Sequence, residues 1–103
     1  MLVRNDAIGC LDHAYLKLEQ HISKHGDGPI PPSLEFRFRS VEFTIDTIMP
    51  ESTLSYNDAL AIVPVFALKM GREGYQWWRA RIISTEGAGH VGDAVIFGGF
   101  HFP

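Results

Sequence analysis

A single cysteine, Cys10, is present among the 103 residues. One thiol cannot form an intrachain disulfide, and the count excludes the cysteine-rich zinc frameworks. Cationic side chains are scarce as well, because nine Lys and Arg residues stand against twelve Asp and Glu, giving a formal net charge of −3. Proteins that bind nucleic acids present a net basic face to the phosphates, so we expect no nucleic-acid partner.

Long apolar runs are also missing. No run approaches the roughly 18 apolar residues of a membrane span, and the opening residues MLVRNDAIGC lack the apolar stretch of a signal peptide. We therefore expect a soluble cytoplasmic protein with no membrane partner, provided that no signal peptide has been removed. With 46% hydrophobic and 20% charged residues the chain can build a core. Its length predicts one domain over residues 1–103.

The first expected helix spans Asp6–Lys24. Asn5 or Asp6 would supply its N-cap oxygen, and Gly26 in HGDG would end it. Apolar residues recur in this segment at alternating spacings of three and four, which places them on one buried stripe. The predicted stripe consists of Ile8, Leu11, Tyr15, Leu18 and Ile22.

A second helix is expected after MPESTLSYNDAL. Ser55 and Asp58 form a capping-box pattern at its start. Pro64 lies well past the first turn, so it predicts a kink or two abutting helices. Gly71 and Gly74 predict the end of the helix. Its predicted buried face consists of Ala59, Ile62, Val63, Phe66 and Met70.

Strand periodicity appears in LEFRFRSVEFTIDTI. Apolar and polar residues alternate over Leu34–Phe38 and again, with the opposite parity, over Val41–Ile45. The change at Arg39–Ser40 fits a two-residue hairpin, which would pair Phe38 with Val41, or a β-bulge within one long strand. Arg-Ser lacks the Gly or Asn of a tight hairpin turn, so the bulge is favoured.

Two further strands, Tyr75–Ser84 and Val91–Phe97, are expected to pair in the antiparallel direction around the glycine-rich segment TEGAGH. The order of the elements is then helix, bent strand, helix, strand, strand. This order predicts an α+β fold in which two helices pack on one face of a small antiparallel sheet. The sheet would have three or four strands, one of them bent by the bulge.

Both tryptophans lie side by side in GYQWWRARII. Neighbouring side chains of a strand point to opposite faces, so the two tryptophans cannot both enter one core. Trp78, Ala80 and Ile82 form the apolar side, which is the predicted core face. The other side is aromatic and cationic and consists of Tyr75, Trp77, Arg79, Arg81 and Ile83.

The aromatic and cationic side has three interpretations. The first is a protein–protein interface, because Trp, Tyr and Arg are enriched as interface anchors. The second is a concave pocket for an aromatic or anionic small molecule. The third is a surface cation–π contact between Trp77 and Arg79 worth about 0.5–1 kcal/mol. The tail GGFHFP adds Phe100 and Phe102 as a further site of self-association.

Two pairs of residues could carry acid–base or nucleophilic chemistry. Glu42 and Asp46 share the polar side of the expected bent strand and could act as acid and base if that side lined a cavity. Cys10 and His13 lie one helical turn apart, within reach of a thiolate–imidazole pair. Both of them lie off the predicted buried stripe, however, and no third group orients the imidazole.

Two motifs suggest ligands without completing a site. His21 and His25 have the spacing at which two helical imidazoles chelate one metal, but a third ligand is not evident, so no metal or other cofactor is predicted. EGAGHVG, Glu86–Gly92, is similar to a phosphate-binding loop. The segment after it has strand character, and the Lys-Ser/Thr pair of such loops is missing. We expect a hairpin loop in which Gly87 and Gly89 take positive φ.

The segment Leu54–Ile96 resembles uncharacterised small fungal proteins. The shared features are a Leu-(Ser/Thr)-Tyr-x-Asp helix start, a long apolar helix, a Gly-ended turn and a strand pair joined through Val-Gly. Pro64 departs from this pattern. The resemblance implies no activity and supports only the α+β layout.

Taken together, the residues favour a small binding domain that self-associates as a dimer, through the aromatic and cationic strand side or the tail. The alternative is a small cofactor-independent enzyme of the lyase, isomerase or hydrolase type. Its pocket would lie between the curved sheet and the kinked helix, with Asp46 and a histidine as the acid–base pair. Such a pocket would take a small apolar or aromatic ligand.

Overall fold

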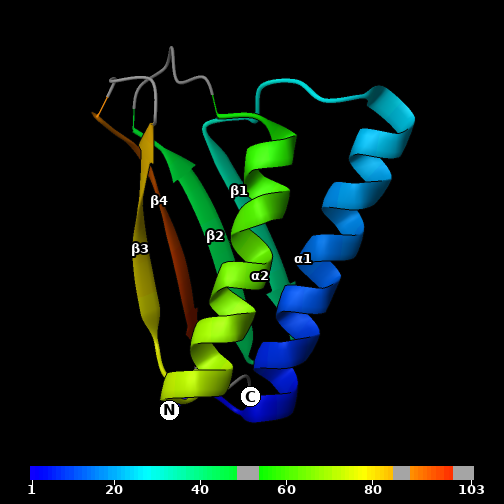
Figure 1. The fold of residues 1–103 in the computed structure, drawn as a ribbon. Helices are drawn as coiled ribbons and strands as arrows, with labels where there is room; N and C mark the ends of the chain where they lie inside the picture. Colours follow the sequence, from blue (N-terminus) through cyan, green and yellow to red (C-terminus); the bar gives the residue numbers. More distant parts are fainter. Residues whose placement is uncertain (49–53, 85–88, 99–103) are drawn as a thin grey trace.

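The computed structural model describes residues 1–48, 54–84 and 89–98. Its four strands form one antiparallel sheet in the order β1-β2-β4-β3, and both helices lie on the same face of it (Figure 1). The predicted α+β fold is confirmed. The elements are α1 (Arg4–His25), β1 (Ser33–Phe38), β2 (Val41–Thr47), α2 (Tyr56–Glu73), β3 (Trp78–Ser84) and β4 (Gly89–Gly98).

The core lies between the helices and the covered face of the sheet. Side chains of β2 alternate between buried and half-buried, so Val41, Phe43 and Ile45 all point at the helices. Phe66 of α2 meets the Phe43 ring edge-on, with 5.1 Å between ring centroids. Burial of each such side chain stabilises the fold by about 1.5–3 kcal/mol. Alternation in the strands therefore decides which sheet face receives the helices.

The buried face of α1 differs from the predicted stripe. Leu11 and Leu18 are buried as expected, whereas Ile8 and Tyr15 are 39% and 37% exposed. Small residues take their place against the sheet because they allow the helix to approach it closely. A Cβ atom at Gly9 would collide with the ring of Phe38. The buried residues of α1 are Asp6, Ala7, Cys10, Leu11, Ala14 and Leu18.

At the two ends of α1, the predicted C-terminal stop is confirmed and the predicted N-cap is wrong. Gly26 follows the helix with φ 77°, which confirms the glycine stop. The N-cap is Val3, whose side chain has no capping oxygen, and neither Asn5 nor Asp6 caps the helix. Asp6 is buried instead and turns toward the β1–β2 connection.

The β1–β2 connection is a two-residue hairpin, so the favoured bulge at this place is wrong. Phe38 pairs with Val41 in the register of the two strands, and Arg39 takes a left-handed φ of 53°. Asp6 supports this turn from α1: it accepts a hydrogen bond from the Ser40 hydroxyl at 2.7 Å and lies 3.6 Å from the Arg39 guanidinium. A tertiary contact therefore compensates for the missing turn glycine.

The capping box at the start of α2 is confirmed. The Asp58 N–H donates to the Ser55 hydroxyl at 3.1 Å, and the Ser55 N–H donates to the Asp58 carboxylate at 2.9 Å. Asp27, in the connection after α1, accepts a further bond from the Asn57 N–H at 3.0 Å. This bond is the main cause that lowers the pKa of Asp27 below its ordinary value. The start of α2 is thus held both by its own cap and by the connection from α1.

The body of α2 follows the predicted pattern with two corrections. The helix continues as one element through Pro64, so two abutting helices are wrong. It also runs through Gly71 and ends at Glu73, followed by Gly74 with φ 107°. The expected buried face is confirmed for Ala59, Val63, Phe66 and Met70, and Ile62 is half-buried.

Candidate interaction surfaces

One side of the sheet faces away from the helices, and within the described residues no helix covers it (Figure 1). We call this side the outer sheet face. The strand register aligns its side chains in rows across the sheet. It consists of Ser33, Glu35 and Arg37 of β1, Glu42, Thr44 and Asp46 of β2, Asp93, Val95 and Phe97 of β4, Arg79 and Arg81 of β3, and Trp77 just before β3.

The two tryptophans lie on opposite sides, as the strand parity predicts. Trp78 packs against the core, donates its indole N–H to the Gly74 carbonyl at 3.1 Å and has the Lys69 ammonium 4.6 Å above its ring. Trp77 is 59% exposed and meets the ring of Phe97 edge-on at 5.9 Å. Trp78 is therefore part of the fold, whereas Trp77 and Phe97 form an aromatic corner of the outer sheet face.

Charged side chains converge on Asp93 in the same face. Its carboxylate lies 3.4 Å from the Arg79 guanidinium and 3.0 Å from the His90 imidazole. Arg81 and Asp46 occupy the positions directly opposite Asp93 on the two neighbouring strands. Burial acts to raise the pKa of Asp93, but the hydrogen bonds from His90 and Arg79 outweigh it and hold that pKa below its ordinary value.

Tyr75 does not share the face of Trp77, so its predicted placement is wrong. It precedes β3 and packs on the helix side, where the Arg4 guanidinium lies 5.7 Å from its ring. The Leu2 N–H donates to the Tyr75 carbonyl at 2.7 Å, which ties the start of the chain to this connection. Strand parity fails for Tyr75 because a bend at Tyr75 and Gln76 separates it from β3.

The remaining residues of the predicted aromatic and cationic side are exposed, as expected. Arg79, Arg81 and Ile83 are all exposed, and Ile83 follows a register shift between Ile82 and Ile83 that forms the bulge of this sheet edge. Phe100 and Phe102 lie outside the described residues.

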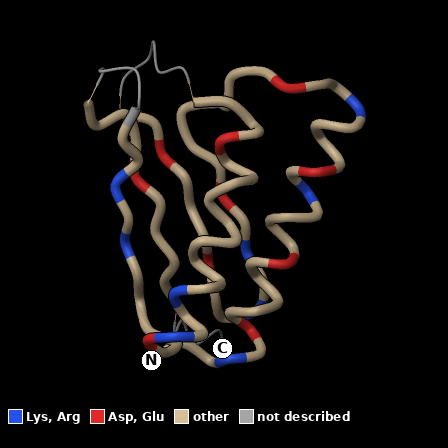
Figure 2. Tube along the Cα trace, in the orientation of Figure 1, with Lys and Arg blue, Asp and Glu red and all other residues tan. Residues whose placement is uncertain are grey.

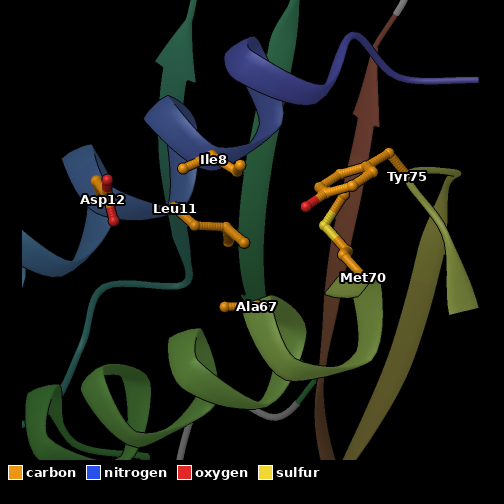
Figure 3. A pocket seen from close by; sticks show the side chains of 6 residues that line it. All are labelled: Ile8, Leu11, Asp12, Ala67, Met70 and Tyr75. Carbon is orange, nitrogen blue, oxygen red and sulfur yellow. The ribbon is translucent and has the colours of Figure 1, made fainter. Parts of the chain in front are cut away.

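A small apolar hollow lies on the helix side, where Tyr75 reaches across toward Ile8 and Leu11 (Figure 3). Its volume is about 60 Å³. Pockets for drug-sized molecules measure roughly 300–1,000 Å³, so this hollow has room for no more than a small apolar group. It is lined by Ile8, Leu11, Asp12, Ala67, Met70 and Tyr75.

Glu42 and Asp46 are both half-buried on the outer sheet face. The sheet separates them from the hollow between the helices. Glu42 and Asp46 therefore do not line this hollow, and it is not the pocket expected for the alternative enzyme. In place of such a pocket, the structure brings Asp46 opposite Asp93 in an open, charged region.

Cys10 is fully buried, so its predicted position off the buried stripe is wrong. Its thiol donates a weak hydrogen bond to the Phe36 carbonyl, with the sulfur 3.4 Å from the oxygen. Burial raises the pKa of Cys10 to about 11. The thiol therefore remains protonated at neutral pH and is not a nucleophile. Cys10 contributes to the packing of the core.

His21 has a structural partner. Its ring stacks on that of Tyr56 with a centroid distance of 3.7 Å, and the centroid of the His25 ring lies 4.9 Å from that of His21. Among the described residues no group of three or more potential metal ligands occurs. The stacked pair instead joins the end of α1 to the start of α2.

Only part of EGAGHVG can be compared with its prediction, since residues 85–88 lie outside the described ones. Gly89 has φ 74°, which confirms the positive φ expected there. Gly89 and His90 already belong to β4, consistent with a loop that leads into a strand.

The outward side of α2 is a further surface that the sequence interpretation missed. Val65 and Leu68 are 60% and 59% exposed, although they belong to an apolar helix. Figure 2 shows α2 without charge between Asp58 and Lys69, whereas α1 carries charges along its whole length. The signal was present in the uncharged run ALAIVPVFAL, because a helix that is apolar all round needs burial on both sides.

Comparison with protein-family models, with curated proteins and with solved structures found no match. In the described part of the chain, neither helix has the combination of length and apolar content that crossing a bilayer requires. Function is therefore argued from the geometry of the surfaces.

Proposed function

We propose that the protein is an interaction domain that self-associates through the outer sheet face. The observation that carries this proposal is the aromatic corner of Trp77 and Phe97 next to the exposed guanidinium groups of Arg79 and Arg81. Aromatic residues and arginine are enriched in the centres of protein interfaces and contribute most of their binding energy. On this face they lie on the strands or directly beside them, and no helix of the described residues covers them.

The two halves of the outer sheet face carry net charges of opposite sign. The β1–β2 half holds Glu35, Glu42 and Asp46 against Arg37, which is −3 + 1 = −2. The β4–β3 half holds Arg79 and Arg81 against Asp93, which is +2 − 1 = +1. A two-fold axis parallel to the strands places the acidic half of one copy against the basic half of the other. Glu35 and Arg79 share one row of the register, so they would face each other in this dimer.

The size of the face sets the strength of association. Four strands at about 4.8 Å spacing and seven residues at about 3.3 Å rise give a flat area of roughly 400–450 Å² per chain. Two such faces bury about 900 Å², less than the roughly 1,200–2,000 Å² of stable complexes. We therefore expect a reversible dimer with a dissociation constant in the micromolar range.

Size-exclusion chromatography with light scattering tests the aromatic corner. Trp77→Ala should weaken association through this face by about fivefold or more, since truncation of an aromatic anchor at an interface typically costs more than 1 kcal/mol. Tyr15→Ala, which removes an exposed ring from α1, is the matched control and should leave association unchanged. Equal effects of the two substitutions would sink the proposal.

A charge-reversal cycle tests the two-fold arrangement separately. Arg79→Glu and Glu35→Arg should each weaken the dimer, because each sets like charges opposite one another. The double variant restores opposite charges and should recover part of the lost affinity. Additive losses in the double variant would contradict the proposed pairing of Glu35 with Arg79.

A further inference from the structure

α2 presents an unusual outward side. It is uncharged from Ala59 to Leu68, and its exposed residues Val65 and Leu68 have no covering element among the described residues. A helix that is apolar on all sides is normally buried on all sides. We infer that α2 is a second self-association surface, on which another copy of this chain docks its own α2 in the antiparallel direction.

Five exposed residues of α2 follow a single stripe. They recur at spacings of three, four, three and four, the pattern of the facing positions in a pair of packed helices. The stripe lies on the side of α2 away from the buried residues Ala59, Val63, Phe66 and Met70. We call it the α2 stripe, and it consists of Asp58, Ala61, Val65, Leu68 and Arg72, all exposed.

The α2 stripe matches itself when one copy is reversed. With the two-fold axis at Val65, residues equally far before and after Val65 come together. Asp58 then faces Arg72 of the other copy, since both lie seven residues from Val65. The small side chain of Ala61 lies beside the large one of Leu68. Opposite charges at the ends and complementary sizes in the middle thus select a second copy as the occupant.

The neighbourhood of the stripe fits a helix better than a lipid surface. Pro64 and Gly71, which lie beside the stripe, are compact and exposed, so another backbone can approach closely. A helix that lies on a bilayer flanks its apolar face with several Lys and Arg residues. Here Asp58 and Arg72 end the stripe with opposite signs, and the chain has a net charge of −3.

This surface is independent of the outer sheet face, because α2 lies on the other side of the sheet (Figure 1). A chain with two separate two-fold surfaces assembles beyond the dimer, into a closed assembly where the axes intersect at a suitable angle (a tetramer at 90°) and into an open array where they do not.

Disulfide cross-linking tests the position of the axis. Val65→Cys should form covalent dimers under dissolved oxygen, because the two substituted positions meet at the axis, within the reach of a disulfide. Cys10 is buried and does not interfere. Leu16→Cys places an equally exposed thiol on α1 and is the matched control. The inference is overturned if both variants cross-link at the same rate.

Molar masses of single and double variants separate the two surfaces. Leu68→Glu should weaken the helix contact by about tenfold or more, as for other central anchors, and leave dimers that depend on Trp77. Trp77→Ala should leave dimers that depend on Leu68. If the Trp77→Ala variant is monomeric, the helix contact is overturned and the sheet contact stands. If the Leu68→Glu variant is monomeric, the sheet contact is overturned and the helix contact stands.

Discussion

α1 and α2 cover the same face of the sheet, but their outward sides differ. α1 buries small residues such as Ala7 and Ala14 and carries charges along its exposed side (Figure 2). α2 buries large residues such as Phe66 and Met70 and exposes further apolar ones. α1 also exposes Ile8, Tyr15 and Leu16, but charged residues lie among them. The exposed apolar residues of α2 lie in an uncharged stretch, and no element of the described residues covers them.

The largest expected difference concerns thiol reactivity on the two helices. Cys10 of α1 is buried and its pKa is raised to about 11, so it should react with a disulfide reagent only when the chain opens. At a concentration where the copies do not associate, the thiol introduced by Val65→Cys on α2 should react about a thousandfold faster or more. Absorbance of the released thiolate measures both rates. A comparable rate at Cys10 in the native protein would contradict its burial.

A matched pair of alanines provides the next test. Ala14 of α1 is fully buried, whereas Ala61 of α2 is exposed. Ala14→Leu should lower the free energy of unfolding by about 1–3 kcal/mol, because the larger side chain overpacks the contact with the sheet. Ala61→Leu should change it by less than about 0.5 kcal/mol. Urea unfolding followed by circular dichroism measures both, and equal losses would refute the assigned faces.

The smallest effect concerns the charges of the outer sheet face. The pKa of Asp93 is lowered, so its carboxylate stabilises the fold above the ordinary Asp pKa, and this contribution disappears as the pH falls through the lowered value. Asp93→Asn should therefore be less stable than the wild type near pH 6, by less than about 1 kcal/mol. The difference should vanish once the pH has fallen below the lowered pKa of Asp93.

Asp46→Asn is the control for this titration. It removes the carboxylate directly opposite Asp93 and leaves the contacts of Asp93 with His90 and Arg79 in place. Since like charges directly across two strands repel, this change should not destabilise the fold near pH 6. A loss equal to that of Asp93→Asn would contradict the role assigned to the His90 and Arg79 contacts.

Local patterns in the sequence were sufficient for most of the fold. Alternation in the strands separated Trp77 from Trp78, because the direction of a side chain in a strand depends only on its neighbours. The capping box at Ser55 and the glycine after each helix depend on equally short-range chemistry. The α+β fold and the order of its elements could therefore be predicted.

The features that could not be predicted depend on contacts between residues that lie far apart in the sequence. The Arg39–Ser40 hairpin depends on Asp6, which lies 34 residues before Ser40 in the sequence. The buried face of α1 was misassigned because Ile8 and Tyr15 are more apolar than Ala7 and Ala14, whereas close approach to the sheet requires the small residues. Pairing of β2 with β4 likewise joins segments on either side of α2.

The residues of the candidate surfaces also fall into those that local sequence predicts and those that only the fold identifies. Arg79, Arg81 and Trp77 could be placed from strand parity, whereas their charged and aromatic partners Asp93 and Phe97 became known only through the strand register. Val65 and Leu68 were missed because apolar residues of a helix are assigned to the core by default. Only the exposed fractions in the fold identify them as a surface.

The most direct test of self-association is the molar mass in solution over a concentration series, measured by light scattering. One chain has a mass of 11.5 kDa. The wild type should rise from this value with concentration and pass that of a dimer. The variant that combines Trp77→Ala with Leu68→Glu should stay at 11.5 kDa throughout. A wild type that remains at 11.5 kDa up to several hundred micromolar, on the order of the weakest specific complexes, would contradict the account.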